Sequence, residues 1–168
     1  MIKPLKILAL VLGLLALAGC GFTPMYAKNG TNQALQDTFS GVNVAPIPDR
    51  LGQIVRNHLL DRINPYGGPA NPDFILQIAL EQESEGFGFR SDESITRSSF
   101  ILEANFQLID AISGKVVFEG LVRSVHTYDV VQSDFANFSA EQDAEARTAL
   151  QVSELVTGRL GLFFKSKQ

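Results

Sequence analysis

The chain has 168 residues, of which 45% are hydrophobic and 19% are charged, a composition typical of one globular domain. Its formal net charge of −4 means that it lacks the basic field that non-specific nucleic-acid binding requires, so no nucleic-acid partner is expected. The single cysteine, Cys20, excludes an internal disulfide and any zinc site built from several cysteines.

Residues 1–19 predict a lipoprotein signal peptide. A basic start precedes an apolar run, 7–18, that is too short to span a bilayer comfortably and has the length of a signal-peptide core. The stretch Leu17-Ala18-Gly19-Cys20 resembles the bacterial lipobox. This resemblance implies cleavage before Cys20 and acylation of its sulfur and of the new amino terminus. The alternative is an N-terminal anchor helix that is never cleaved.

Acyl chains on Cys20 predict an essentially permanent membrane anchor and no other cofactor, because each buried methylene contributes about 0.8 kcal/mol. Gly21 stands where an aspartate would retain a Gram-negative lipoprotein in the inner membrane, which favours the outer membrane. Removal of the signal peptide deletes two lysines and no acid, leaving 12 basic and 18 acidic residues. We expect residues 20–41 to be a lipid-anchored tether and 42–168 to be a single domain.

The folded part begins with a strand and a helix. Residues 42–47 alternate apolar and polar side chains, which predicts a short strand. Asp49 is a suitable N-cap for a helix whose apolar residues recur at helical spacing up to Ile63, with His58 on its apolar side. The proline- and glycine-rich residues 64–69 then end this helix.

Three strands are predicted to follow in succession. Residues 74–83 form the first, and 84–94 are expected to be a strand end or a mobile loop. Residues 98–110 give the clearest alternation in the chain, and 116–131 form the return strand after a turn at 110–115. The residues of the second strand expected to face the core are Phe100, Leu102, Ala104, Phe106 and Leu108.

A long helix is predicted to close the domain. Ser139 as N-cap and Gln142 three residues later match a capping box, and an apolar stripe follows. The predicted order is therefore β-α-β-β-β-α. This order predicts an α+β fold: an antiparallel-rich four-stranded sheet with two helices packed on one face.

No segment predicts an active site or a metal site, and we expect no enzymatic activity. Ser124, His126 and Asp129 invite comparison with a catalytic triad, but Asp129 has the opposite parity on the predicted strand. No glycines of a nucleophile elbow flank the serine. These three side chains are therefore interpreted as ordinary polar residues of a strand.

Three arginines, Arg90, Arg97 and Arg123, lie on or beside the predicted central strands. A guanidinium binds phosphate or carboxylate through two parallel hydrogen bonds, so these residues are candidate phosphate contacts. The alternative is pairing with neighbours such as Glu103 or Glu119. The turn at 110–115 leaves the register open by one residue, and a slip of one residue would move Arg123 to the other face.

Several short motifs resemble the LPS-assembly lipoprotein family LptE, also called RlpB, as it occurs in alphaproteobacteria. The most specific is the start of the mature chain, Cys20-Gly21-Phe22-Thr23-Pro24-Met25-Tyr26, followed by the strand, strand, helix order. Further matching positions are Arg97, Leu108-Ile109-Asp110, Ser113-Gly114, Gly120, Arg123, Tyr128, Ser133, Phe135-Ala136, Asp143-Ala144 and Arg147.

This resemblance implies a non-enzymatic outer-membrane lipoprotein that plugs the LPS-translocon β-barrel LptD, helps it fold and assists delivery of lipopolysaccharide to the cell surface. It also implies a sheet with two helices on one face, a body facing the periplasm or lying within the barrel lumen, and lipid A phosphates as ligands for Arg90, Arg97 and Arg123. The alternative functions are an auxiliary lipoprotein of another envelope export system and a periplasmic hydrolase using Ser124 and His126.

Overall fold

A computed structural model describes residues 38–89 and 95–167 of the chain. The signal peptide, Cys20 and Arg90 lie outside these residues. The described elements are β1 (Val42–Val44), α3 (Asp49–Ile63), β2 (Phe74–Phe89), β3 (Ile95–Asp110), β4 (Val116–Asp129) and α4 (Asp134–Ser166).

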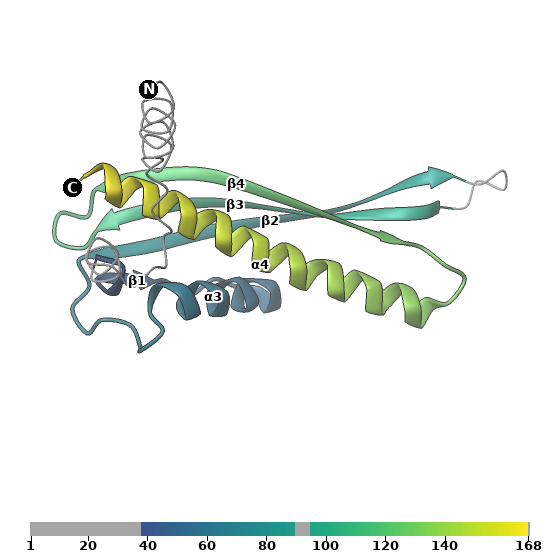
Figure 1. The fold of residues 1–168 in the computed structure, drawn as a ribbon, viewed down its shortest axis with the longest axis horizontal. Helices are drawn as coiled ribbons and strands as arrows, with labels where there is room; N and C mark the ends of the chain where they lie inside the picture. The colour runs from purple at the N-terminus through teal and green to yellow at the C-terminus, as the bar shows by residue number, and fades with distance from the viewer. Residues whose placement is uncertain (1–37, 90–94, 168) are drawn as a thin grey trace, which may run out of the picture.

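The four strands form one sheet in the order β1-β2-β3-β4. β1 pairs with β2 in parallel, whereas β2, β3 and β4 pair antiparallel. Helices α3 and α4 pack against each other, and α4 crosses the long twisted sheet diagonally (Figure 1). The predicted α+β class, element order and two-helix covering are confirmed.

Helix α3 forms because Leu51, Val55, Leu59 and Ile63 recur at helical spacing and are all buried. Asp49 is not the N-cap, as predicted, but the first residue of the helix, with a left-handed φ of 66°. Pro48 occupies the N-cap position in an extended conformation and supplies no capping side chain.

His58, predicted to lie on the apolar side of this helix, is only partly buried. It lies one position before Leu59 and therefore points about 100° away from the buried side of α3. The predicted break after α3 is confirmed, since Asn64 is the C-cap and its N–H donates to the carbonyl of Leu60.

Strand β2 extends six residues beyond its predicted end at Glu83. Glycines make this extension possible. A β-carbon on Gly86 would lie only 2.7 Å from Cδ1 of Ile95, so the bare backbone accommodates that side chain. Gly88 takes a φ of 75°, which glycine adopts without strain. The stretch expected to be a strand end is thus part of the ladder.

The β3–β4 turn settles the register left open by the sequence. Gly114 adopts a φ of 68° and its N–H donates to the Asp110 carbonyl at 2.9 Å. A β-bulge lies between Leu108 and Ile109. As a result Glu103 is directly opposite Arg123, and the two side chains share a face.

Helix α4 begins six residues earlier than predicted, with Ser133 as N-cap and Ser139 inside the helix. The Asn137 side chain explains this start, because it both accepts from the Val131 N–H and donates to the Val131 carbonyl. These two hydrogen bonds hold the preceding loop against the first turn. None of the helices in the described part of the chain combines the length and apolar character needed to cross a bilayer.

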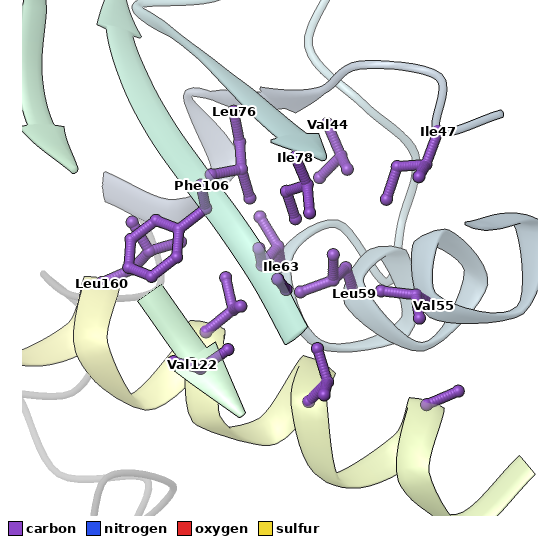
Figure 2. Packing of buried hydrophobic residues seen from close by; sticks show 14 of the residues in the cluster. Val44, Ile47, Val55, Leu59, Ile63, Leu76, Ile78, Phe106, Val122 and Leu160 are labelled. Atoms are coloured by element: carbon purple, nitrogen blue, oxygen red, sulfur yellow. The ribbon is translucent and has the colours of Figure 1, made fainter. Parts of the chain in front are cut away.

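One hydrophobic core joins the sheet to both helices. Figure 2 shows Leu59 and Ile63 of α3 close to Leu76 and Ile78 of β2, with Phe106 of β3 and Leu160 of α4 beside them. All five residues predicted to face the core from β3 are buried.

Phe39 lies within the stretch expected to be a tether, yet it is buried in this core. Its ring meets that of Phe164 edge-on at 5.8 Å between centroids. Residues 38–41 therefore belong to the folded body.

Candidate interaction surface

Within residues 38–89 and 95–167, the helices cover one face of the sheet and leave the other uncovered. We call the uncovered side the open face, and it carries the odd-numbered residues of β2, β3 and β4 between Gln77 and Asp129. Because side chains alternate along a strand, the open face is where most exposed polar and charged residues of the sheet gather.

Arg97 and Arg123 both lie on the open face, each about half exposed, and each is paired with an acid. The Arg97 Nε lies 3.1 Å from Oδ1 of Asp129, and the Arg123 Nε lies 3.0 Å from Oε1 of Glu103. In both pairs the acid and the arginine are direct cross-strand partners. The alternative proposed from the sequence, pairing with neighbouring acids such as Glu103, is thus the arrangement observed.

The two arginines do not form one site. Arg123 is opposite Glu103, which is six residues from Arg97 along β3, so the guanidiniums are separated by roughly 20 Å of strand. Each would have to exchange its carboxylate partner for a phosphate. The position of Arg90 lies outside the described residues.

Strand β2 makes its side of the open face acidic. Glu81, Glu83 and Glu85 alternate along it, and Glu81 is directly opposite Glu103. Like charges in directly opposite positions destabilise a strand pair. Arg123, on the far side of Glu103, offsets part of this repulsion. An anion approaching the open face would therefore meet isolated cations next to an acidic strand.

A shallow depression of about 520 Å³ opens on the same face. Ala79 has the shortest side chain among the open-face residues that line it, and the backbone at Gly120 lies beside it. The other lining residues are Gln77, Asn105, Phe106, Gln107 and Glu119. The rim is mostly uncharged amide, which suits a polar protein surface better than an ionic ligand.

Ser124 and His126 point to the covered face, where each bonds to α4. The Ser124 hydroxyl donates to Oε1 of Gln151 at 2.6 Å, and Nδ1 of His126 lies 3.1 Å from Oγ1 of Thr148. Asp129 is bound to Arg97 on the open face. A triad needs serine, histidine and acid bonded in series. Here the three residues make three separate structural contacts.

No metal cluster is present within residues 38–89 and 95–167, where no three His, Cys, Asp or Glu side chains gather at ligating distance. The sequence reasoning did not single out exposed apolar residues on β4. Leu121 is 50% exposed and Val125 is 42% exposed, both on the open face. The sequence does contain a sign of them. Leu121 and Val125 are apolar residues at odd-numbered positions of a strand whose even-numbered positions face the core.

No protein-family model matches the chain, and no curated protein sequence matches it either. Solved structures do match. A protein assigned as a lipoprotein from Caulobacter crescentus superposes with a TM-score of 0.67 at 20% identity, over 80% of this chain and 98% of that one. Rare lipoprotein B from Shewanella oneidensis gives a TM-score of 0.57 at 13% identity, over 76% and 97% of the two chains.

The chain has the fold of rare lipoprotein B. Lipoprotein B from Nitrosomonas europaea is a further likeness, with a TM-score of 0.55 at 11% identity over 74% of this chain and 82% of that one. These matches cover nearly the whole of the Caulobacter and Shewanella structures, so the likeness concerns a complete domain. At these identities it is a likeness of fold, and it confirms the fold that the family resemblance implied.

Proposed function

We propose that this chain is an LptE-type outer-membrane lipoprotein, one that partners and plugs the LPS-translocon barrel LptD and assists its assembly and the delivery of lipopolysaccharide to the cell surface. The observation that supports this most is the coincidence of two independent features. The fold matches rare lipoprotein B over almost the whole of that protein. The sequence places a lipobox cysteine and the start CGFTP ahead of that fold.

The shape and surface are compatible with a plug. The lumen of an outer-membrane barrel is polar, and the open face presents charged and amide side chains. The body is long and narrow, since a long helix runs beside strands of up to 16 residues (Figure 1). An acyl anchor on Cys20 would hold the body beside its barrel and raise its effective concentration there. In this proposal the protein has no catalytic role.

Direct contact with lipid A phosphates through Arg90, Arg97 and Arg123 is a separate part of the proposal. Asp129→Asn would release Arg97 from its carboxylate, and Glu103→Gln would release Arg123. If these guanidiniums bind phosphate, both changes strengthen binding of purified lipopolysaccharide. Replacing all three arginines by glutamine with no loss of binding would remove this part and leave the plug proposal intact.

Depletion in the native bacterium tests the proposal as a whole. We expect loss of correctly assembled LptD, measured as the folded barrel on a heat-modifiability gel, and loss of surface lipopolysaccharide. Re-expression of the wild-type chain should restore both, while Cys20→Ala should restore them poorly. If depletion leaves both unchanged while export of another envelope component fails, the auxiliary-lipoprotein alternative is correct instead.

A further inference from the structure

Strand β4 is the last strand of the sheet, and no described element pairs with its outer side. It runs for 14 residues from Val116 to Asp129 without a proline. Helix α4 packs on the covered face of β4 (Figure 1). A long regular edge strand presents a row of unpaired backbone groups, which proteins normally shorten, interrupt or cover. Within residues 38–89 and 95–167, the β-bulge near the start of β4 is the one such interruption, and the strand beyond it stays open.

The open-face residues of β4 are complementary to themselves when the strand is reversed. Glu119 lies two residues before Leu121, and Arg123 lies two residues after it. In an antiparallel pair centred on Leu121, Glu119 of each copy therefore faces Arg123 of the other, and Leu121 faces its own equivalent. Val117, the extra residue of the β-bulge, then lies across from Val125 at the end of the regular pairing. Opposite charges and apolar residues in directly opposite positions both stabilise a strand pair.

Only this register joins Glu119 to Arg123. Centring the pair on Val122 or Gly120 instead would place each of these two charges opposite an apolar residue. Centring it on Arg123 would place Arg123 against Arg123, and centring it on Glu119 would place Glu119 against Glu119. Both are destabilised by like charge. The edge of β2 beyond Leu76, which β1 does not cover, carries Glu81, Glu83 and Glu85 and has no such complementarity.

We propose that two copies of this chain pair through their β4 edges, antiparallel and centred on Leu121, to form one continuous eight-stranded sheet. The partner is a second copy because the charge pattern of β4 matches its own reverse. This inference goes beyond the proposed function and does not depend on it. The two Glu119–Arg123 pairs related by the two-fold axis fix the register, and the apolar residues between and beyond them lose part of their exposure to water.

The flank of α4 above this edge supports the same pairing. Gln151 of α4 bonds to Ser124 of β4, so this side of the helix faces β4. Leu155 lies one turn beyond Gln151, and Leu162 lies two turns further on the same side. They are 39% and 69% exposed. A continuous sheet would bring the α4 helices of two copies next to each other, with these leucines between them.

Thiol cross-linking tests the register directly in the full-length lipoprotein, extracted in detergent. Leu121→Cys should give a covalent dimer with a short bis-maleimide reagent. Asn105→Cys is the matched control, since Asn105 is exposed, on the same face and directly opposite Leu121 on β3. Its two copies would be farther apart by two strand spacings, about 10 Å in total. The wild-type chain shows any contribution from Cys20.

A mixture of Val117→Cys and Val125→Cys chains provides an independent test. We expect cross-linking in the mixture and little in either chain alone. Glu119→Arg or Arg123→Glu should each reduce the Leu121→Cys dimer by about tenfold, because each creates like-charge pairs at the interface. The double exchange should restore the dimer. The double exchange still places two acids, at positions 103 and 123, opposite each other within each copy. Because this repulsion within a copy remains, restored dimerisation would come from the contact between copies.

The proposal is overturned if Leu121→Cys cross-links no better than Asn105→Cys and the valine mixture no better than its components. In that case the β4 edge is left to a different partner. The proposal is also overturned if the variant with both charge changes dimerises no better than the variants with one, since the pairing would then not follow this register.

Discussion

Gly120 lies directly opposite Phe106 in the β3–β4 ladder, and the phenyl ring occupies the place of the missing side chain. A β-carbon on Gly120 would lie 2.7 Å from Cζ and 3.0 Å from Cε1 of Phe106. Phe106 is 1% exposed and also packs on Phe118, with ring centroids 5.7 Å apart. The glycine thus leaves room for the outer end of a large aromatic ring beside the neighbouring strand.

Gly120→Ala should therefore destabilise the fold. Displacing a packed ring costs about 1–3 kcal/mol. Alanine loses less conformational entropy on folding than glycine, which offsets up to about 1 kcal/mol of that cost. We expect a net loss of about 1–2 kcal/mol in the free energy of unfolding, measured by urea denaturation.

Gly158→Ala in α4 is the matched control, since no atom lies within 4 Å of its β-carbon position. There the same change should stabilise the protein by about 0.5–1 kcal/mol. Equal effects at the two glycines would contradict the packing argument.

Phe164 joins the C-terminal end of α4 to the start of the folded body. Its ring contacts those of Phe39 and Phe74, with centroids 5.8 and 5.6 Å away. Phe164→Ala should cost about 3–5 kcal/mol of unfolding free energy, and hydrogen exchange should show that residues 38–41 open more readily. Phe135→Ala, on the first turn of the same helix and 81% exposed, should change stability by less than about 0.5 kcal/mol.

The Asp110 carboxylate organises the β3–β4 turn and gives it a pH dependence. The N–H of Ser113 donates to Oδ1 at 2.6 Å. This bond, then the Ser113 hydroxyl and then the Ile112 N–H lower the pKa of Asp110 below its ordinary value of 3.8. The charged form is thus favoured in the folded state, and the stability it contributes is present above pH 3.8 and lost as the pH falls below it.

Asp110→Asn should accordingly reduce stability at about pH 6, and the difference from the wild-type chain should shrink below about pH 4. Parallel urea titrations at several pH values measure this. A difference that stays constant from about pH 6 to about pH 2.5 would contradict the assignment of the carboxylate to the turn.

Ser124 is a structural residue in this account. Ser124→Ala removes its bond to Gln151 and should cost about 1 kcal/mol of unfolding free energy. Gln151→Ala in the same background should cost little more, because the pair is already broken. Neither change should affect complementation of a depleted strain. Loss of function with unchanged stability would instead support the hydrolase alternative.

The sequence predicted the sheet and its helices because the buried residues of each strand and helix recur at the spacing characteristic of that element. The alternating residues Phe100 to Leu108 and the spacing of Leu51 to Ile63 identify one strand and one helix without any tertiary information. The start of α4 was missed because Asn137 fixes it by bonding back to Val131, and a plausible capping box at Ser139 competed with it. The end of β2 was missed because Gly86 and Gly88 look like a loop until Ile95 fills the space beside them.

The interaction surface was less predictable. Arg97 and Arg123 were correctly placed on or beside the central strands, but their partners depended on a register that a β-bulge at Leu108 and Ile109 decides. The open edge of β4 could not be recognised at all, since it depends on which strand ends the sheet. A sequence specifies strands more directly than it specifies their order.

The measurement that tests the central claim most directly is co-purification from detergent-solubilised outer membranes with a C-terminal tag on the chain. The account predicts one large barrel, LptD, recovered in near-equal amounts with the lipidated protein. Recovery of the lipidated protein from the outer membrane without that barrel would contradict it.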